Sequence, residues 1–316
     1  MIKKNYEISK LKQNYNYIGD EIRQYFGDRV YKISLDAGCS CPNRDGTKGT
    51  KGCFYCGETG AHYIEAEKKL SITEQIQRAK AKFKRHNIHK FIVYFQSFTS
   101  TYGDIKYLEK VYEEALQGDD IVGFNICTRP DCLGDDILDL LAQIMKPRYH
   151  WLELGLESGH DLTLQKIGRG HDYQAFEEAY FRAKAKGLRI CVHLILGLPG
   201  ETEEMMLATV DKMNELQVDG IKFHNLYVVK NSVFEQMYRK DEIELMALYE
   251  YAELIGKVVS RLDPKIVIHR LAADAPGNIL VAPSWAEKRG YALNSIEQYF
   301  QKHGVVQGKL IKHPNN

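Results

Sequence analysis

The sequence lacks the features that would tie the protein to a membrane. It contains no run of 18 or more apolar residues, which excludes an ordinary transmembrane helix. Its start, Met-Ile-Lys-Lys-Asn-Tyr-Glu, has no apolar signal region, so we expect a cytoplasmic protein with no membrane partner. The formal net charge is only +1, which excludes a chain that is basic throughout and coats nucleic acid. We recognise no low-complexity segment and no second independent domain.

The composition is that of a globular protein with a substantial core. The chain has 316 residues, of which 44% are hydrophobic and 27% charged, enough for one large domain or two ordinary ones. The cysteines number seven, an odd count, and they are unevenly spread. In a reducing compartment this pattern favours metal or redox chemistry over disulfides.

Short apolar runs recur along the chain, as in repeated β/α units. From the second onward the runs begin about 30 to 40 residues apart, which suits a strand followed by a helix. They are almost continuously apolar, as strands buried on both faces should be. The predicted strands are Val30–Leu35, Phe91–Gln96, Ile121–Ile126, His150–Leu156, Leu188–Leu196 and Gly220–Val228.

Helical patterns fill the gaps between these strands. Apolar residues at helical spacing predict helices over Leu138–Met145 and Phe176–Ala183, and Gly187 is a plausible stop for the second. Ser71-Ile-Thr-Glu74 has the form of a capping box and predicts a helix start. Six such units predict an α/β fold, either a partial TIM barrel or a doubly wound sheet. In both, functional residues collect at the carboxyl ends of the strands.

The pattern changes beyond about Pro264. One more short strand, Ile266–Arg270, is followed by a Pro/Gly-rich stretch and by a last helix over Asn294–His303. We therefore expect a main domain over residues 1–262 and a short α/β extension, 263–316, packed on it.

Three cysteines lie in a loop directly after the first strand, at the edge where chemistry is expected. Cys53 and Cys56 form a Cys-x-x-Cys pair, which lets two thiolates bind one metal ion or cluster. A third ligand must come from Cys39 or Cys41.

The residues alone leave three kinds of centre open. A structural zinc site would need a fourth ligand, which Cys39 or His62 could supply. A redox dithiol would use Cys53 and Cys56, although such pairs normally open a helix in a thioredoxin-like unit. A [4Fe–4S] cluster on three cysteines would keep one iron open to a small molecule.

The cysteine loop resembles that of the radical S-adenosylmethionine (SAM) superfamily. The ending Cys53-Phe54-Tyr55-Cys56 is its hallmark. The usual first spacing is three residues, whereas here it is eleven from Cys41, a departure shared with a subgroup related to the elongator catalytic subunit. Four motifs in order are similar to the YhcC/YtqA family, including its MnmL-like branch. They are Asp36-Ala-Gly with Cys41-Pro-Asn-Arg-Asp-Gly, Tyr94–Tyr102, Leu154–Ser158 and Ile195–Thr202.

The resemblance implies a radical SAM partial TIM barrel, (β/α)6-like, with a [4Fe–4S] cluster and SAM as cofactors. The implied cluster ligands are Cys41, Cys53 and Cys56, since related proteins have an aromatic residue at the position of Cys39. The fourth iron would bind the amino and carboxylate groups of SAM. An electron would then cleave SAM and yield a 5′-deoxyadenosyl radical, a reaction that the cofactor performs and the protein shields.

The resemblance also implies which side chains meet SAM. Tyr55 would lie by the adenine, and Arg169 could pair with the SAM carboxylate through its guanidinium fork. Each polar candidate could instead be a loop cap or a surface contact. The remaining candidates end predicted strands: Gln96, Ser97 and Thr99 the second, Glu157 and Ser158 the fourth, and Gly197 the fifth.

His193, His224 and Tyr227 are the candidates for contact with the substrate. They lie on the fifth and sixth predicted strands, and alternation places Cys191 and His193 on one face. A histidine that lines a barrel near a radical site can bind substrate, or it can be a hydrogen-bonded core residue. The residues do not decide between these roles.

Five further residues near the predicted site have an open role. Cys127 and Cys132 follow the third strand, and an inert buried thiol is the simplest interpretation of each. His269, Arg270 and Trp285 could complete the substrate pocket from the C-terminal segment or simply pack there.

The family resemblance implies a tRNA substrate. MnmL-like proteins are associated with the wobble uridine at position 34, where 5-carboxymethylaminomethyl-(2-thio)uridine becomes 5-aminomethyl-(2-thio)uridine. The implied partners are the tRNA anticodon stem-loop and an electron donor such as ferredoxin or flavodoxin. Two alternatives remain: a radical SAM enzyme acting on a protein or small molecule, and a zinc-stabilised RNA-binding protein. The oligomeric state is not indicated.

Two basic stretches are compatible with tRNA contact through phosphates, or with an ordinary solvated surface. The first comprises Arg78, Lys80, Lys82, Lys84, Arg85 and Lys90, and the second Lys302, Lys309, Lys312 and His313.

Overall fold

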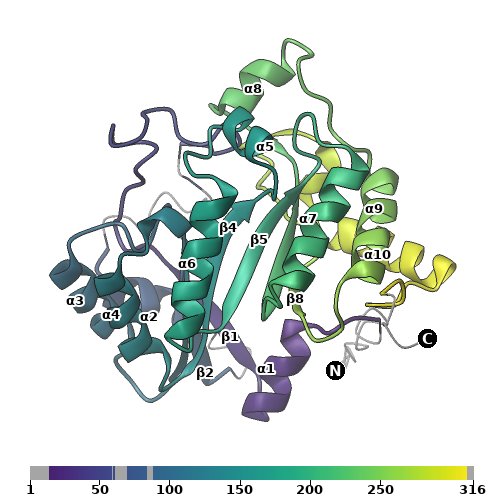
Figure 1. Ribbon diagram of the computed structural model, residues 1–316. Helices are drawn as coiled ribbons and strands as arrows, with labels where there is room; N and C mark the ends of the chain where they lie inside the picture. Colours follow the sequence, from purple (N-terminus) through teal and green to yellow (C-terminus); the bar gives the residue numbers. More distant parts are fainter. Residues whose placement is uncertain (1–13, 59, 61–69, 84–87, 312–316) are drawn as a thin grey trace.

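The computed structural model describes residues 14–58, 60, 70–83 and 88–311 (Figure 1). Within them, seven parallel strands form one sheet in chain order, curled into a partial barrel. This arrangement confirms the predicted α/β partial TIM barrel. The strands are β1 (Val30–Leu35), β2 (Lys90–Phe95), β3 (Ile121–Thr128), β4 (Tyr149–Glu157), β5 (Ile190–Leu196), β6 (Gly220–Asn225) and β8 (Val267–Arg270).

The seventh strand of the sheet comes from the segment expected to be a C-terminal extension. β8 pairs in parallel with β6, with Val267 opposite Gly220. On its other side the chain near Tyr17 forms a bridge to Ile268. The boundary at residue 262 stays a prediction, but the extension contributes a strand to the barrel itself.

The sixth predicted strand is two strands in the structure. β6 ends at Asn225, and β7 (Val228–Val229) pairs antiparallel with β9 (Leu280–Ala282) in a separate small sheet. The apolar run continues through the break because both pieces are buried.

Helices cover the outer face of the curled sheet, and α5 and α8 lie at the opposite end from α1 (Figure 1). The capping box predicted at Ser71 is present: its backbone N–H donates to Glu74 Oε2 at 2.8 Å, and the N–H of Glu74 donates to Ser71 Oγ at 3.2 Å. None of the helices in the described ranges has the length and apolar character that crossing a bilayer requires. The α-helices are α1 (Ile18–Phe26), α2 (Ile72–Phe83), α3 (Ile105–Ala115), α4 (Asp135–Met145), α5 (Asp161–Lys166), α6 (Tyr173–Ala185), α7 (Glu203–Glu215), α8 (Val233–Tyr238), α9 (Leu248–Arg261) and α10 (Arg289–His303).

An apolar plug closes the amino end of the barrel. The indole of Trp151 is fully buried, and the guanidinium of Arg189 lies 3.9 Å from its ring centroid. Arg189 also pairs with Glu21 of α1 at 2.8 Å, which ties this helix to the plug. The closed amino end leaves the carboxyl ends of the strands as the place for a ligand. The plug consists of Ile18, Ile92, Tyr149, Trp151, Cys191 and Val267.

Candidate functional site

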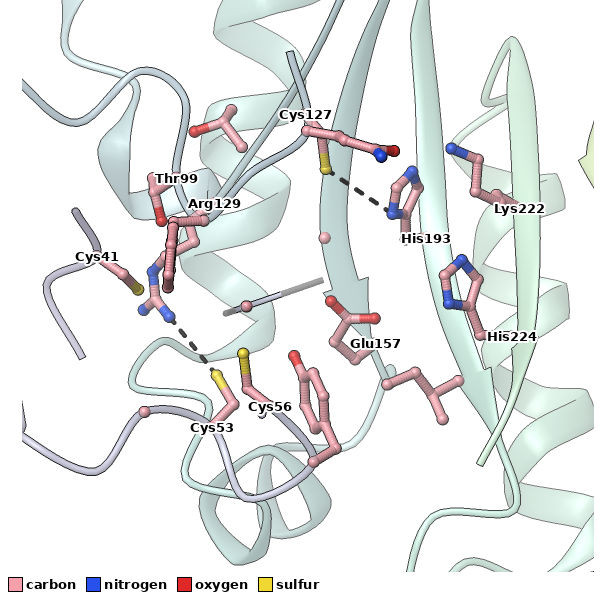
Figure 2. A pocket seen from close by; sticks show the side chains of 18 of the residues that line it. Cys41, Cys53, Cys56, Thr99, Cys127, Arg129, Glu157, His193, Lys222 and His224 are labelled. Atoms are coloured by element: carbon pink, nitrogen blue, oxygen red, sulfur yellow. Dashed lines mark hydrogen bonds between the residues drawn. The ribbon is translucent and has the colours of Figure 1, made fainter. Parts of the chain in front are cut away.

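A cavity of about 380 Å³ opens at the carboxyl ends of the barrel strands. Its lining combines the cysteine loop with side chains that the strands direct into the barrel. Figure 2 shows three cysteines on one side, basic side chains of β5 and β6 on the other, and Glu157 between them. The cysteines are Cys41, Cys53 and Cys56, and the basic residues are His193, Lys222 and His224.

The cysteine loop is anchored on the turn between α5 and α6. The side-chain amide of Asn43 donates to the carbonyl oxygens of Gly168 at 2.9 Å and Arg169 at 3.0 Å. The N–H of Phe54 donates to the carbonyl of Ile167 at 2.9 Å. A Cβ at Gly168 would lie 2.7 Å from the Phe54 ring, so this close approach requires glycine. The loop conformation therefore depends on residues more than a hundred positions away.

Donors surround the sulfur of Cys53, as a thiolate ligand requires. Asn43 Nδ2 lies 3.4 Å from it, Arg169 Nη1 3.5 Å and Arg129 Nη1 3.9 Å. Burial, and then the neighbouring Cys53 sulfur, raise the pKa of Cys56 to about 11. Three thiolates on one wall, two of them buried, thus need more positive charge than the protein supplies, and the irons of a cluster would provide it. The residues fit a [4Fe–4S] centre.

The other cysteines have different surroundings. Cys39 lies outside the cavity lining, with its thiol 3.8 Å from the carbonyl of Ser100, and burial raises its pKa to about 12. Cys191 belongs to the apolar plug. Cys127 does line the cavity, with Sγ 3.9 Å from His193 Nδ1 (Figure 2). This placement favours Cys41 over Cys39 as the third ligand.

Glu157 is turned into the cavity by an irregularity in β4. The β4–β5 register shifts between Gly155 and Glu157, and Glu157 has a φ of 79°. This left-handed conformation costs a non-glycine residue about 1–3 kcal/mol, a strain that is concentrated at functional sites. Burial raises the pKa of the Glu157 carboxyl, although Arg169 and a hydrogen bond from Tyr55 oppose the shift. Arg169 Nη2 lies 3.5 Å from Glu157 Oε1.

The other residues predicted to meet SAM fall into two groups. Tyr55, Gln96 and Thr99 line the cavity. Ser97, Ser158 and Gly197 are not part of the lining, and the two serines are almost fully buried. A direct contact of these three with SAM stays a prediction.

The three residues predicted for the substrate, His193, His224 and Tyr227, all line the cavity. The rings of His193 and His224 are stacked, with centroids 5.6 Å apart. Burial and the ammonium of Lys222 lower the pKa of His193 to about 4, so its imidazole is neutral near neutral pH.

Of the C-terminal candidates, one lines the cavity and two do not. Arg270 is part of the lining. His269 instead packs edge-on against Trp151 of the plug, with centroids 4.3 Å apart. Trp285 packs on Tyr251 and donates its indole N–H to a backbone carbonyl. Of the two roles left open for His269 and Trp285, the structure favours packing.

A buried charge network beneath the cavity is absent from the sequence predictions. Glu153 is fully buried, and its Oε2 accepts from the Tyr94 hydroxyl at 2.6 Å and lies 2.7 Å from His193 Nε2. Lys222 forms an ion pair with the same oxygen, and Lys32 lies 3.8 Å from the other. Burial disfavours the charge on Glu153, but Lys222 and the bond to His193 hold its pKa well below the usual range.

A sequence signal for this network existed. Glu153 and Lys222 are charged residues inside apolar runs that predict strands buried on both faces. Glu153 precedes Glu157 by four residues and Lys222 precedes His224 by two, so alternation puts each on the face of a predicted site residue. Arg129 and Asn43 carry no such signal, because their role depends on the folded loop.

Comparisons with known proteins agree with this geometry. Residues 45–213 match the family described as the radical SAM superfamily, and residues 218–302 match the radical SAM C-terminal domain. Protein YhcC of Escherichia coli K12 is 36% identical over 306 residues, covering 96% of this chain and 98% of that protein. The tRNA uridine(34) acetyltransferase of Methanocaldococcus jannaschii is 24% identical over 187 residues, 58% of this chain and 34% of that protein.

Among solved structures, the archaeal Methanocaldococcus infernus Elp3 with an N-terminal deletion shares the fold, with a TM-score of 0.69 at 17% identity. The likeness covers 88% of this chain and 64% of that chain.

The family match covers more than half of the chain, and the likeness to YhcC extends over nearly all of it. Radical SAM enzymes use a [4Fe–4S] cluster and SAM, which the cysteine side of the cavity fits. The structural zinc site and the redox dithiol are thereby set aside. The chain belongs to the radical SAM superfamily, within the YhcC/YtqA family, and is a [4Fe–4S]- and SAM-dependent enzyme.

Proposed function

We propose that Cys41, Cys53 and Cys56 hold the cluster and that SAM binds beside it in the cavity. The observation that carries this proposal is the convergence of the three cysteines on one cavity wall (Figure 2). When bound, the cluster supplies the electron that cleaves SAM to the 5′-deoxyadenosyl radical.

The protein groups beside the cysteines would hold SAM in place. Arg169 Nε is buried and has no partner within the described part of the chain, so an acceptor is missing there. A carboxylate would satisfy it, which supports the pairing of Arg169 with the SAM carboxylate. Tyr55 lies in the lining next to two of the cysteines, where the adenine would stack. Glu157 carries a strained backbone and a buried carboxyl, which suits a fixed contact to the cofactor.

We propose that the substrate is the wobble uridine of tRNA, converted from 5-carboxymethylaminomethyl-(2-thio)uridine to 5-aminomethyl-(2-thio)uridine. The likeness to the tRNA uridine(34) acetyltransferase of Methanocaldococcus jannaschii supports a tRNA substrate. An unpaired anticodon base can be splayed out of its loop and enter the barrel mouth. The radical would abstract a hydrogen atom from the carboxymethyl carbon. Loss of one further electron, to the oxidised [4Fe–4S] cluster, would give an imine, and its hydrolysis by water would release the two-carbon unit as glyoxylate and leave the primary amine. A ferredoxin or flavodoxin would deliver the electrons.

The basic stretches contribute exposed charge for such an RNA. Arg78 and Lys82 are exposed on α2, and Lys302 and Lys309 near the C-terminus are also exposed. Lys80 is engaged with Asp120 at 2.6 Å. Lys84, Arg85, Lys312 and His313 lie outside the described residues.

Nucleoside mass spectrometry tests the proposed conversion. The enzyme is incubated anaerobically with SAM, a reductant and tRNA that carries the carboxymethylaminomethyl group. We expect loss of this nucleoside and gain of its aminomethyl product, together with 5′-deoxyadenosine. Formation of 5′-deoxyadenosine with an unchanged nucleoside would reject this substrate and favour a protein or small molecule.

A further inference from the structure

We propose that the wall of the cavity formed by β6 and β8 is an anion subsite that holds the carboxylate of the substrate's carboxymethyl group. The proposal rests on the proposed function, and Arg270 and His224 are the residues that would contact the carboxylate. Both line the cavity, Arg270 at the end of β8 and His224 near the end of β6.

Arg270 differs from the other arginines of the cavity lining in its contacts. The other three arginines of the lining have acceptors: Arg44 contacts backbone carbonyls, and Arg129 and Arg169 contact carboxylates. Arg270 has no ion pair within the described ranges of the chain. A half-buried guanidinium that lacks an anion is a recognition element for a carboxylate, which it can grip with two parallel hydrogen bonds.

His224 supplies a second unsatisfied group on the same wall. Its Nε2 is buried and has no hydrogen-bond partner among the described residues. Burial, and then the nearby Arg270, keep the pKa of His224 well below its usual range, so the ring is neutral. A neutral imidazole offers one N–H, which a carboxylate placed between His224 and Arg270 could accept.

The charge balance of this half of the barrel also admits an anion. Three basic groups, Lys32, Lys222 and Arg270, stand with two carboxylates, Glu153 of the buried network and Asp274 of the lining. Burial lowers the pKa of Lys32, and His193 and His224 are neutral, so this half carries no excess of negative charge that would repel a carboxylate. Charge interactions are strong in a site with little water, so the guanidinium of Arg270 would attract a bound carboxylate strongly.

The position of the subsite suits the chemistry. Lys222 and His224 lie across the cavity from Cys53 and Cys56 (Figure 2). A carboxylate held at the β6–β8 wall would direct its attached methylene back towards the cysteine side, where the radical forms. The carboxylate of SAM has a separate candidate in Arg169, which lies on the cysteine side.

Equilibrium binding of two RNAs tests the subsite. The first is an anticodon stem-loop carrying 5-carboxymethylaminomethyluridine, and the second carries the same group with its carboxylate converted to a carboxamide. Both are titrated at fixed salt against anaerobic, cluster-loaded protein with SAM. We expect the wild type to prefer the carboxylate by roughly ten- to a hundred-fold. Arg270→Gln should abolish this preference, and Arg270→Lys should retain part of it.

Arg182→Gln is the matched control, because Arg182 pairs with Asp135 on the exposed outer surface. It should keep the full preference. Equal affinity of the wild type for the two RNAs would overturn the subsite, as would a preference that survives in Arg270→Gln. Weaker binding of SAM in Arg270→Gln, with the RNA preference intact, would assign Arg270 to the cofactor and also overturn it.

The subsite and the proposed conversion can fail separately. A preference for the carboxylate that depends on Arg270, without nucleoside conversion, would uphold the subsite and reject the conversion. Nucleoside conversion without a preference for the carboxylate would uphold the conversion and reject the subsite.

Discussion

The two sides of the cavity hold their charges in different ways. On the cysteine side, Arg129 and Arg169 come from outside the loop and direct donors at the sulfur of Cys53. On the opposite side, charged groups stand on the strands themselves and gather around Glu153, beneath the cavity floor. The first arrangement would compensate the thiolates of the proposed cofactor site. In the second, Lys222 and Lys32 face the buried carboxylate of Glu153.

The comparison shows that the loop and the strands contribute to the cavity in different ways. A loop such as Cys41–Cys56 can wrap a bulky centre, but it needs distant anchors to keep its shape. Strand residues two apart share a face without such help, so they suit a fixed wall against which a substrate is placed.

Removal of a proposed cluster ligand should have the largest effect, because it should abolish binding of the cluster. Cys41→Ala leaves the cluster with two protein ligands, so we expect near-total loss of iron and of SAM cleavage. Cys39→Ala is the control, since its thiol contacts a carbonyl outside the cavity lining, and it should keep most of both. Iron content and 5′-deoxyadenosine are measured after anaerobic reconstitution. The opposite ranking of the two variants would show that Cys39 is the ligand.

Loss of the buried carboxylate should destabilise the strand side most. Glu153→Gln leaves Lys222 and Lys32 without their counter-charge, and we expect a loss of about 3–5 kcal/mol in the free energy of unfolding. Asp135→Asn removes an exposed ion pair and should cost only about 0–1 kcal/mol. Urea denaturation of the two variants compares them. Equal losses would mean that the network is solvated rather than buried.

Replacement of Arg169 should weaken SAM binding with less effect on the fold of the barrel. Arg169→Gln removes the charge proposed for the SAM carboxylate, so we expect roughly ten- to a hundred-fold weaker binding of SAM. Gly155→Ala should displace the same guanidinium, because a Cβ at this position would lie 2.6 Å from Arg169 Nη2. Equilibrium dialysis with SAM measures both. Unchanged SAM affinity in both variants would remove Arg169 from the cofactor site.

Acidification should have a smaller effect on the free energy of unfolding, and His193 should be the group that causes it. Its pKa is about 4 in the folded protein and 6.5 in an ordinary environment, so the unfolded chain takes up the proton first as the pH falls. The free energy of unfolding should therefore fall as the pH drops from about 6.5 towards about 4. Urea titrations from about pH 7 to about pH 5 should show a shallower dependence for His193→Asn. A slope identical to that of the wild type would mean that His193 is already protonated in the fold.

Much of the fold was predictable because its signals are local. The bounds of β1 coincide with the predicted strand, and the capping box at Ser71 starts α2 as expected. Burial on both faces produces continuous apolar runs, and a cap needs only residues within one turn. The break between β6 and β7 was missed because both pieces are largely buried, so no exposed stretch separates them.

Residue types and short spacings were enough to predict the α/β class, the cysteine motif and the rim of the barrel on which this motif lies. Only the tertiary structure placed Arg129 and Asn43 on the Cys53 sulfur and joined Glu153 to Lys222 across 69 residues. Such contacts depend on the curl of the sheet and on where loops return, which no local pattern records. The place of Arg270 in the cavity lining, without an ion pair to any described residue, became visible for the same reason, because such pairing is a property of the folded neighbourhood.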